Sequence, residues 1–191
     1  MLNCILASAS PRRKELLKRI IDEFQVVTSD FDEKSVRFDS SVEEYVEELA
    51  YGKARNVLSK ATEDSIIIAA DTIVVIEGKI LGKPKDDLDA YKMLQLLSDN
   101  VHEVYTGIVV INTYNNKVLK SVEKTKVKFS KLNEEDIRGY IETGEPMDKA
   151  AAYGIQGKGG VFVEKIEGCF YNVVGLPLNR LRKMLLEIVE D

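Results

Sequence analysis

The 191-residue sequence has one histidine, two cysteines and no tryptophan. Serine and cysteine hydrolases usually need an imidazole base beside the nucleophile. The single imidazole, His102, lies between an expected helix and an expected strand with no evident partner for that task. Cys4 and Cys169 are too few and too far apart for a zinc site or a disulfide framework, so both are expected as core thiols. Chemistry is therefore expected from carboxylates, lysines and arginines, together with a metal ion.

Long apolar runs and an excess of positive charge are also missing. No run approaches the roughly 20 residues that span a bilayer, and the N-terminus lacks the basic and apolar pattern of an export signal. We therefore expect a cytoplasmic protein with no membrane partner. The formal net charge is −5, whereas a general nucleic-acid binder needs a basic face. No nucleic-acid partner is expected.

The remaining composition is that of a globular protein, with 45% apolar and 31% charged residues. Strand-like and helix-like segments alternate at first, and strands dominate later. This order predicts an α/β fold with a mixed, bent sheet, flanking helices and two lobes around a central cleft. We expect one domain over residues 1–191.

The stretch LASASPRRKELL at 6–17 follows a short apolar strand at 4–6. Ser10 is suited to cap the following helix, and Pro11 suits the first helical position because it has no amide donor to leave unpaired. The backbone N–H groups of such a turn, beside Arg12 and Arg13, attract an anion. Phosphate is the natural candidate.

A capping box at 41–44 opens a second helix. Its apolar stripe runs through Val42, Tyr45, Val46, Leu49 and Val57, and helical spacing places Lys53 in the middle of that face. A buried lysine is costly unless an anion meets it. The alternative is a long side chain that passes the helix edge to reach water.

The run SIIIAADTIVVI at 65–76 is a central strand pair or one long bent strand, followed by a hairpin turn at 77–79. Asp71 interrupts it. A carboxylate in so apolar a strand must be paired, protonated or bound to a metal. Structural pairing is one interpretation. The other is that an acid at a strand end, beside two alanines, presents a metal ligand or a base.

Three later features have both a structural and a functional interpretation. Lys83 lies in a Gly-Lys-Pro turn, where a lysine is by default exposed. Lys124, Lys126 and Lys128 alternate along a strand, as a solvated face or as contacts to phosphates. The glycine-punctuated segment 144–157 is a connector or a ligand-contacting segment.

Six stretches match the motifs of one protein family in the same order along the chain. They are LASASPRR at 6–13, ADT at 70–72, GKP at 82–84, YTG at 105–107, DKAAAYGIQG at 148–157 and VVGLP at 173–177. In these stretches the sequence resembles the Maf family of nucleoside triphosphate pyrophosphatases over nearly its whole length. The resemblance implies a fold like that of inosine triphosphate pyrophosphatases. It also implies hydrolysis of a nucleoside triphosphate to the monophosphate and pyrophosphate with a divalent metal, Mg²⁺ or Mn²⁺. The 148–157 segment is similar to the branch that acts on dTTP and UTP.

The resemblance also implies roles for single residues. Asp71 matches the catalytic acid, and Glu33 matches an acidic position that helps to hold metal together with Asp71. Substrate-binding roles are implied for Ser8, Arg13, Lys53 and Lys83 around the triphosphate, and for Arg12, Thr72 and Gln156 in the choice of a pyrimidine. Ala151 departs from the family's pattern, in which glycine is commoner. The resemblance also allows a homodimer.

Two alternatives stay open at this point. One is a non-enzymatic regulator of septum formation and division, or a nucleic-acid-binding protein, suggested by the basic strand. The other is a pyrophosphatase for purine triphosphates of the inosine type. The sequence does not decide whether Asp71 is a base or mainly a metal ligand.

Overall fold

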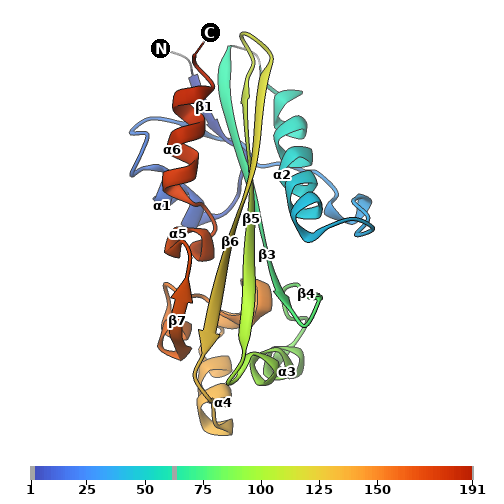
Figure 1. Cartoon of the computed structure of the whole chain (residues 1–191), viewed down its shortest axis with the longest axis vertical. Helices are drawn as coiled ribbons and strands as arrows, with labels where there is room; N and C mark the ends of the chain where they lie inside the picture. The colour runs from blue at the N-terminus through green and yellow to red at the C-terminus, as the bar shows by residue number, and fades with distance from the viewer. Residues whose placement is uncertain (1–2, 62–63, 191) are drawn as a thin grey trace. The chain divides into compact units, whose positions relative to one another are not determined.

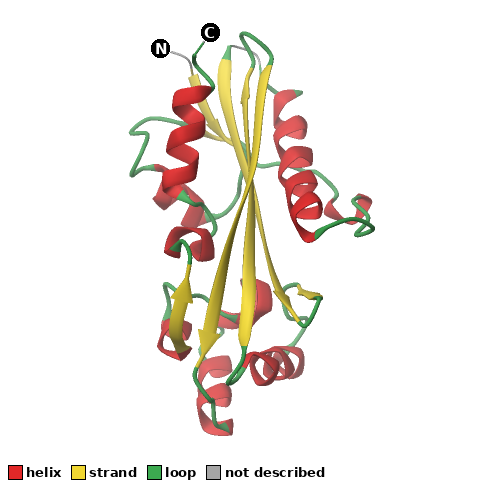
Figure 2. Cartoon of the chain, in the orientation of Figure 1, coloured by secondary structure: helices red, strands yellow, loops and turns green. Residues whose placement is uncertain are grey.

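The computed structural model of the chain describes residues 3–61 and 64–190 (Figure 1). The long elements are three strands of 12 or 13 residues and the 17-residue helix α2 (Figure 2). The strands are β1 (Asn3–Leu6), β2 (Gln25–Val26), β3 (Ser65–Ile76), β4 (Lys79–Leu81), β5 (Val101–Asn112), β6 (Lys117–Phe129) and β7 (Val163–Glu167). The α-helices are α1 (Pro11–Leu17), α2 (Val42–Leu58), α3 (Asp87–Leu97), α4 (Glu134–Glu142), α5 (Phe170–Val174) and α6 (Leu178–Glu187). Short 3₁₀ helices are η1 (Glu33–Ser35), η2 (Glu145–Asp148), η3 (Ala150–Ala152) and η4 (Lys158–Phe162).

The strands pair in the order β2-β1-β3-β5-β6-β7, and β4 pairs with β3. β1 is parallel to β2 and to β3, whereas β3 with β4 and β6 with β7 are antiparallel. The predicted mixed α/β sheet is confirmed.

The chain forms two compact units. The first contains the residues up to Asp71, Thr106–Glu123 and the residues from Gly175 onward, and the second contains Thr72–Tyr105 and Lys124–Val174. Each of β3, β5 and β6 contributes residues to both units. A single domain with one cleft stays a prediction.

The first unit buries the strand run that the sequence indicated. Alternate residues of β3, Ile67 and Ala69, pack with Ala50, Ala54 and Val57 of α2 in one core cluster. This matches the period of two in a strand and the apolar stripe of a helix. Figure 1 shows α2 on one side of β3 and its neighbouring long strands, and α6 on the other side.

The second unit is built around aromatic rings. Phe129 and Tyr153 have ring centroids 4.8 Å apart and stack edge to face. His102 is fully buried beside them, 5.1 Å from the Phe129 ring centroid. Helices α3 and α4 contribute Leu94, Leu97, Ile137 and Tyr140 to the same core cluster.

The expected helix starts are confirmed. Ser10 caps α1 by accepting from the backbone N–H of Arg13, and Ser41 and Glu44 form the capping box of α2. Residues 65–76 form one strand, which decides between the two interpretations of that run.

Several expectations were wrong. Asp71 lies in the middle of β3 and not at a strand end. The apolar run at 161–163 predicts a strand that begins at Val161, but residues 161–162 belong to η4 and β7 begins at Val163, because the glycines at 159–160 favour a tight turn before β7. The helix α5, which is five residues long, was not predicted from the sequence. Cys169 is half-buried and does not belong to the core, whereas Cys4 is buried.

Candidate functional site

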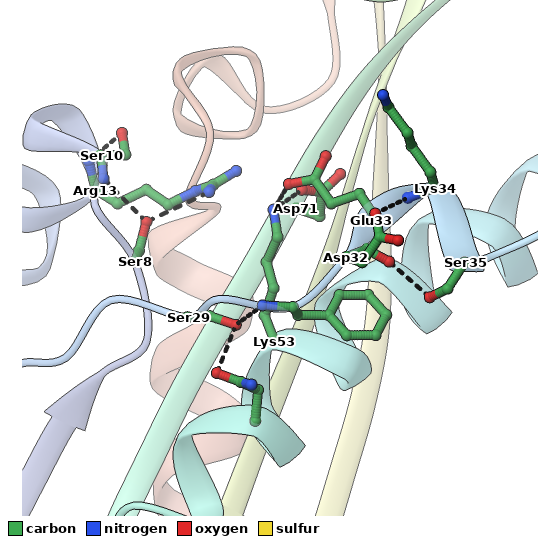
Figure 3. A network of polar contacts seen from close by, with 12 residues as sticks. Ser8, Ser10, Arg13, Ser29, Asp32, Glu33, Lys34, Ser35, Lys53 and Asp71 are labelled. Carbon is green, nitrogen blue, oxygen red and sulfur yellow. Dashed lines mark hydrogen bonds and ion pairs between the residues drawn. The ribbon is translucent and has the colours of Figure 1, made fainter.

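The turn between β1 and α1 places Ser8 beside Arg13, which lies in the first turn of α1 (Figure 3). The Ser8 hydroxyl accepts from the backbone N–H of Ser10 at 3.2 Å and lies 3.5 Å from a terminal guanidinium nitrogen of Arg13. The Arg13 Nε donates to the Gly175 carbonyl at 2.9 Å. The guanidinium is therefore fixed on two sides by its own unit.

Lys53 of α2 lies between two carboxylates (Figure 3). Its Nζ is 2.8 Å from Glu33 Oε1 and forms a close ion pair with Asp71 Oδ1. The side chains of Lys53 and Asp71 are 15% and 10% exposed, whereas Glu33 is 57% exposed. Lys53 therefore meets two carboxylates within the fold. That it also meets the phosphates of a substrate stays a prediction.

The spacing of α2 explains why Lys53 reaches this point. Tyr45, Leu49 and Lys53 follow one another at four-residue intervals and share one helix face. Burial raises the pKa of the Tyr45 hydroxyl, and the negative charges of Asp71 and Glu33 raise it further. Tyr45 therefore lies within the electrostatic reach of both carboxylates.

The position of Asp71 follows from its strand. Its neighbours Ala69 and Ala70 are fully buried, and the β3 backbone holds them in an almost wholly buried strand. A carboxylate there needs a cation, because an unpaired buried charge is costly. Lys53 supplies one.

Arg13 adds a second positive charge to the unit. Burial lowers the pKa of Arg13 below its usual value, and the carboxylates Asp71 and Glu33 act against that change. An arginine remains charged at neutral pH because its ordinary pKa exceeds about 12. Around Asp71 and Glu33 the site therefore has two positively charged side chains, Arg13 and Lys53.

The loop that carries Glu33 is held against α2 by hydrogen bonds and by the packing of one ring. The side-chain oxygen of Asn56 accepts from the Ser29 hydroxyl at 3.2 Å and from the Asp30 backbone N–H at 3.0 Å. The Ser29 hydroxyl also accepts from the backbone N–H of Phe31 at 3.1 Å. The Phe31 ring lies over Gly52, where a Cβ would be 2.3 Å from the ring. These contacts bracket Lys53 on α2 and hold the Glu33 loop beside it.

No sequence pattern predicted that Asn56, Gly52 or Phe31 contributes to the site. The available signal was their spacing, since Gly52 directly precedes Lys53 and Asn56 follows it by three residues. No motif pairs either residue with the 29–40 loop, so the tertiary structure was needed to reveal the contact.

Ser8, Arg12, Arg13, Glu33, Lys53 and Asp71 belong to the first unit, whereas Thr72, Lys83 and Gln156 belong to the second. Arg12 and Thr72 are half-buried. Lys83, just after β4, and Gln156, after η3, are exposed. That all nine face one substrate stays a prediction.

The described residues contain no group of three or more histidine, cysteine, aspartate or glutamate side chains placed to hold a metal ion. Asp71 and Glu33 nevertheless both form ion pairs with the Lys53 ammonium group, so the two carboxylates lie close to the same point. Mg²⁺ is commonly held by one or two carboxylates together with substrate phosphates. The donor set fits that kind of site.

The alternating lysines of β6 and the single histidine lie outside this cluster. Lys124 pairs with Glu103 at 2.7 Å, and Lys128 pairs with Asp99 at 2.7 Å, so two of the three alternating lysines have carboxylate partners. His102 is fully buried and its Nε2 lies 2.7 Å from the Tyr153 hydroxyl. Within residues 3–61 and 64–190, no helix has the length and apolar character that crossing a membrane requires.

A model of the Maf family, described as Maf-like protein, matches residues 3–188. This chain belongs to the Maf family. The resemblance seen in the six motifs is thereby confirmed. The Maf chain is 58% identical to the dTTP/UTP pyrophosphatase of Clostridium botulinum strain Alaska E43 / Type E3, over 98% of this chain and 100% of the relative. It is 57% identical to the dTTP/UTP pyrophosphatase of strain Okra / Type B1, over 98% of each chain.

Among solved structures, the Maf chain resembles a HAM1 protein from Coxiella burnetii. The TM-score is 0.51 at 17% sequence identity, over 98% of this chain and 100% of the other. The two proteins therefore share a fold.

Proposed function

We propose that this Maf chain is a nucleoside triphosphate pyrophosphatase that hydrolyses dTTP and UTP to the nucleoside monophosphate and pyrophosphate. The carrying observation is that relatives 56 to 58% identical over nearly the whole chain bear the name dTTP/UTP pyrophosphatase. The matched region is 98% of this chain, so it spans every stretch in which the family motifs lie. Modified pyrimidine triphosphates belong to the same chemical class of substrate.

In this reaction water attacks the α-phosphorus, the bond from that phosphorus to the bridging α–β oxygen breaks, and pyrophosphate leaves. Such chemistry depends on positioning and on neutralising negative charge more than on covalent work by the protein. Asp71 is proposed as the catalytic carboxylate, which orients the water or accepts its proton. Its burial on a rigid strand and its pairing with Lys53 support this role.

Lys53, Arg13 and Ser8 are proposed to bind the triphosphate from the first unit. The two cations are held beside the carboxylates by contacts within that unit. Lys83 is proposed as a further phosphate ligand, and its exposed side chain is available for it. Arg12, Thr72 and Gln156 are proposed to select the pyrimidine base.

Glu33 and Asp71 are proposed to hold a divalent cation, Mg²⁺ or Mn²⁺. When bound, such an ion neutralises charge on phosphate oxygens and polarises the phosphorus centre. Hard cations prefer carboxylate oxygens, which both residues offer. Lys53 keeps the two carboxylates close together in spite of their like charges.

The alternatives have less support. A nucleic-acid binder or a division regulator that uses the basic strand would need free lysines, but Lys124 and Lys128 have carboxylate partners and the net charge is −5. A purine triphosphate pyrophosphatase is the other alternative, but the likeness to the HAM1 protein shows the fold alone, and a fold does not assign a base. We further propose action in the cytoplasm, either as a monomer or as a homodimer.

The proposal is tested by a panel of dTTP, UTP, ITP, GTP and ATP with Mg²⁺ or Mn²⁺. Release of pyrophosphate is measured together with the nucleoside monophosphate that accompanies it. We expect the two pyrimidine triphosphates to have the highest kcat/KM. Preference for ITP, or release of orthophosphate in place of pyrophosphate, would contradict the proposal.

A further inference from the structure

The loop at 154–160 in the second unit is folded around one carboxylate, that of Glu145 in η2. Glu145 Oε2 accepts the backbone N–H of Lys158 at 2.9 Å, and Oε1 accepts the backbone N–H of Gly159 at 3.3 Å. Burial works to raise the pKa of Glu145, but these hydrogen bonds and one from Tyr140 outweigh it, and the pKa lies below its ordinary value. The carboxylate is therefore held ionised by the loop that it anchors.

Tyr140 of α4 provides the second half of the anchor. Its hydroxyl donates to Glu145 Oε1 at 2.8 Å and accepts the backbone N–H of Gly154 at 3.2 Å. The loop is thus tied on its N-terminal side through Gly154 and on its C-terminal side through Lys158 and Gly159. Gln156 lies between these ties.

The glycines of the loop make this close approach possible. A Cβ at Gly157 would lie 2.3 Å from Glu145 Oε1, and a Cβ at Gly159 would lie 2.6 Å from the Tyr140 hydroxyl oxygen. Real Cβ atoms do not come so near to a polar oxygen, so a side chain at either place would displace the anchor. The glycine spacing in the segment is explained by the Glu145 and Tyr140 side chains that it encloses.

The backbone around Gln156 is also closed by its own turns. Gly157 N–H donates to the Gly154 carbonyl at 3.1 Å, and Gly160 N–H donates to the Gly157 carbonyl at 3.1 Å. The Gln156 side chain is exposed on this ordered turn. Because the backbone is already ordered, only the side chain of Gln156 loses conformational freedom when it binds a base, and this is the advantage of preorganisation.

We propose that Glu145 is a positioning residue for base selection, which fixes the backbone on both sides of Gln156 and so sets where that amide meets the pyrimidine. The inference rests on the proposed function, because it gives Gln156 its base. Glu145 itself touches no substrate in this account. It acts through the loop.

The test is Glu145→Gln, which keeps the shape of the side chain. One carboxylate oxygen becomes an amide nitrogen, so a donor then faces a backbone N–H or the Tyr140 hydroxyl. We expect the ratio of kcat/KM for UTP to that for ITP to fall about tenfold, mainly through a higher KM for UTP, as misplaced polar recognition does. Glu142→Gln, the same change at an exposed position of α4 three residues earlier, should leave the ratio unchanged.

A double-mutant cycle separates positioning from general damage. If Glu145 acts through Gln156, then Glu145→Gln added to Gln156→Ala lowers the UTP to ITP ratio no further than Gln156→Ala alone. Additive losses would overturn the proposal, and so would an unchanged ratio in Glu145→Gln. If Glu145→Gln does not fold, Tyr140→Phe decides by the same ratio and cycle, because it removes the tie to Gly154 and leaves the ring in place.

The two proposals fail in different ways. If the unaltered chain does not release pyrophosphate from UTP, the proposed function fails. If it does so and Glu145→Gln keeps the full preference for UTP, only the positioning role fails.

Discussion

Lys53 of α2 and Asp71 of β3 form an ion pair in which both side chains are largely buried. The pair joins a helix to the strand on which it packs, and Glu33 adds a second carboxylate at 2.8 Å from the same ammonium. Removing one partner of a buried pair leaves the other charge uncompensated, which costs about 3 to 5 kcal/mol where burial is complete. The pair therefore bears on stability as well as on chemistry.

Replacing Lys53 by methionine should lower kcat/KM for UTP by at least about 100-fold, because a cation that faces the phosphates and carboxylates is lost. The two carboxylates are then left facing each other, so the free energy of unfolding in urea should fall as well. Lys92→Met, the same change at an exposed lysine of α3, is the matched control. Nearly unchanged turnover in Lys53→Met would show that the lysine is structural alone.

Replacing Asn56 by alanine should release the loop that carries Glu33. The variant loses the acceptor for Ser29 and Asp30, so we expect about 1 kcal/mol less stability. Activity should fall about tenfold, since a small displacement of a site residue is costly in rate. Asn179→Ala, at an exposed position of α6, is the control in the same assays. Wild-type turnover in Asn56→Ala would contradict the expectation that this contact positions Glu33 for the reaction.

Ala151 has a left-handed backbone, with φ of 56°. Its N–H donates to the Gly82 carbonyl at 2.9 Å, which keeps the residue in that conformation. A left-handed residue other than glycine costs about 1 to 2 kcal/mol, while a buried methyl contributes about 0.8 kcal/mol. Ala151→Gly should therefore be neutral or stabilising by up to about 1 kcal/mol.

The comparison variant is Ala90→Gly, because Ala90 is equally buried but lies inside α3. It loses the same methyl and about 1 kcal/mol of helix propensity. We expect it to unfold at lower urea concentration than Ala151→Gly, with about 2 to 3 kcal/mol between the free energies of unfolding of the two variants. Equal stability would mean that the backbone at Ala151 carries no strain.

The stability of the second unit should depend on pH through His102. Burial lowers the pKa of His102 from 6.5 to about 4 in the folded chain. Its Nδ1 has no hydrogen-bond partner among the residues that the structure describes. The unfolded chain therefore takes up a proton at higher pH than the folded chain does. The contribution of His102 to the free energy of unfolding is fully present when the pH is above its unfolded pKa of 6.5, and it is lost as the pH falls toward the folded pKa of about 4.

Between about pH 7.5 and pH 5 this contribution should decline by about 2 kcal/mol. The measurement is the free energy of unfolding in urea at both pH values for the unaltered chain and for His102→Gln, which has no group that titrates in this range. The difference between the two proteins should change by that amount. A parallel pH dependence in both proteins would contradict the burial of a neutral imidazole.

Local sequence signals predicted much of the fold. The caps at Ser10 and Ser41 fixed the starts of α1 and α2, and the β-branched run fixed β3, because these signals act between neighbours in the chain. The start of β7 was misplaced and α5 was missed, since glycines and short helices are decided by tertiary packing. The middle position of Asp71 in β3 was not predicted, because periodicity does not show where a long strand is paired.

The site was predicted in part for the same reason. Helical spacing on α2 indicated that Lys53 would need an anion, and the structure supplies Asp71 and Glu33. The anchors Asn56 and Glu145 were not predicted, because each acts on a loop distant in sequence or through backbone N–H groups. Such contacts leave no residue pattern along the chain.

The most direct test of the account compares the unaltered chain with Asp71→Asn in pyrophosphate release from UTP in the presence of Mg²⁺. The substitution removes a negative charge at nearly constant shape, and circular dichroism checks that the variant folds. We predict release of pyrophosphate and UMP by the unaltered chain and a loss of at least about 1,000-fold in kcat for Asp71→Asn. Equal activity in a folded Asp71→Asn protein would contradict the account.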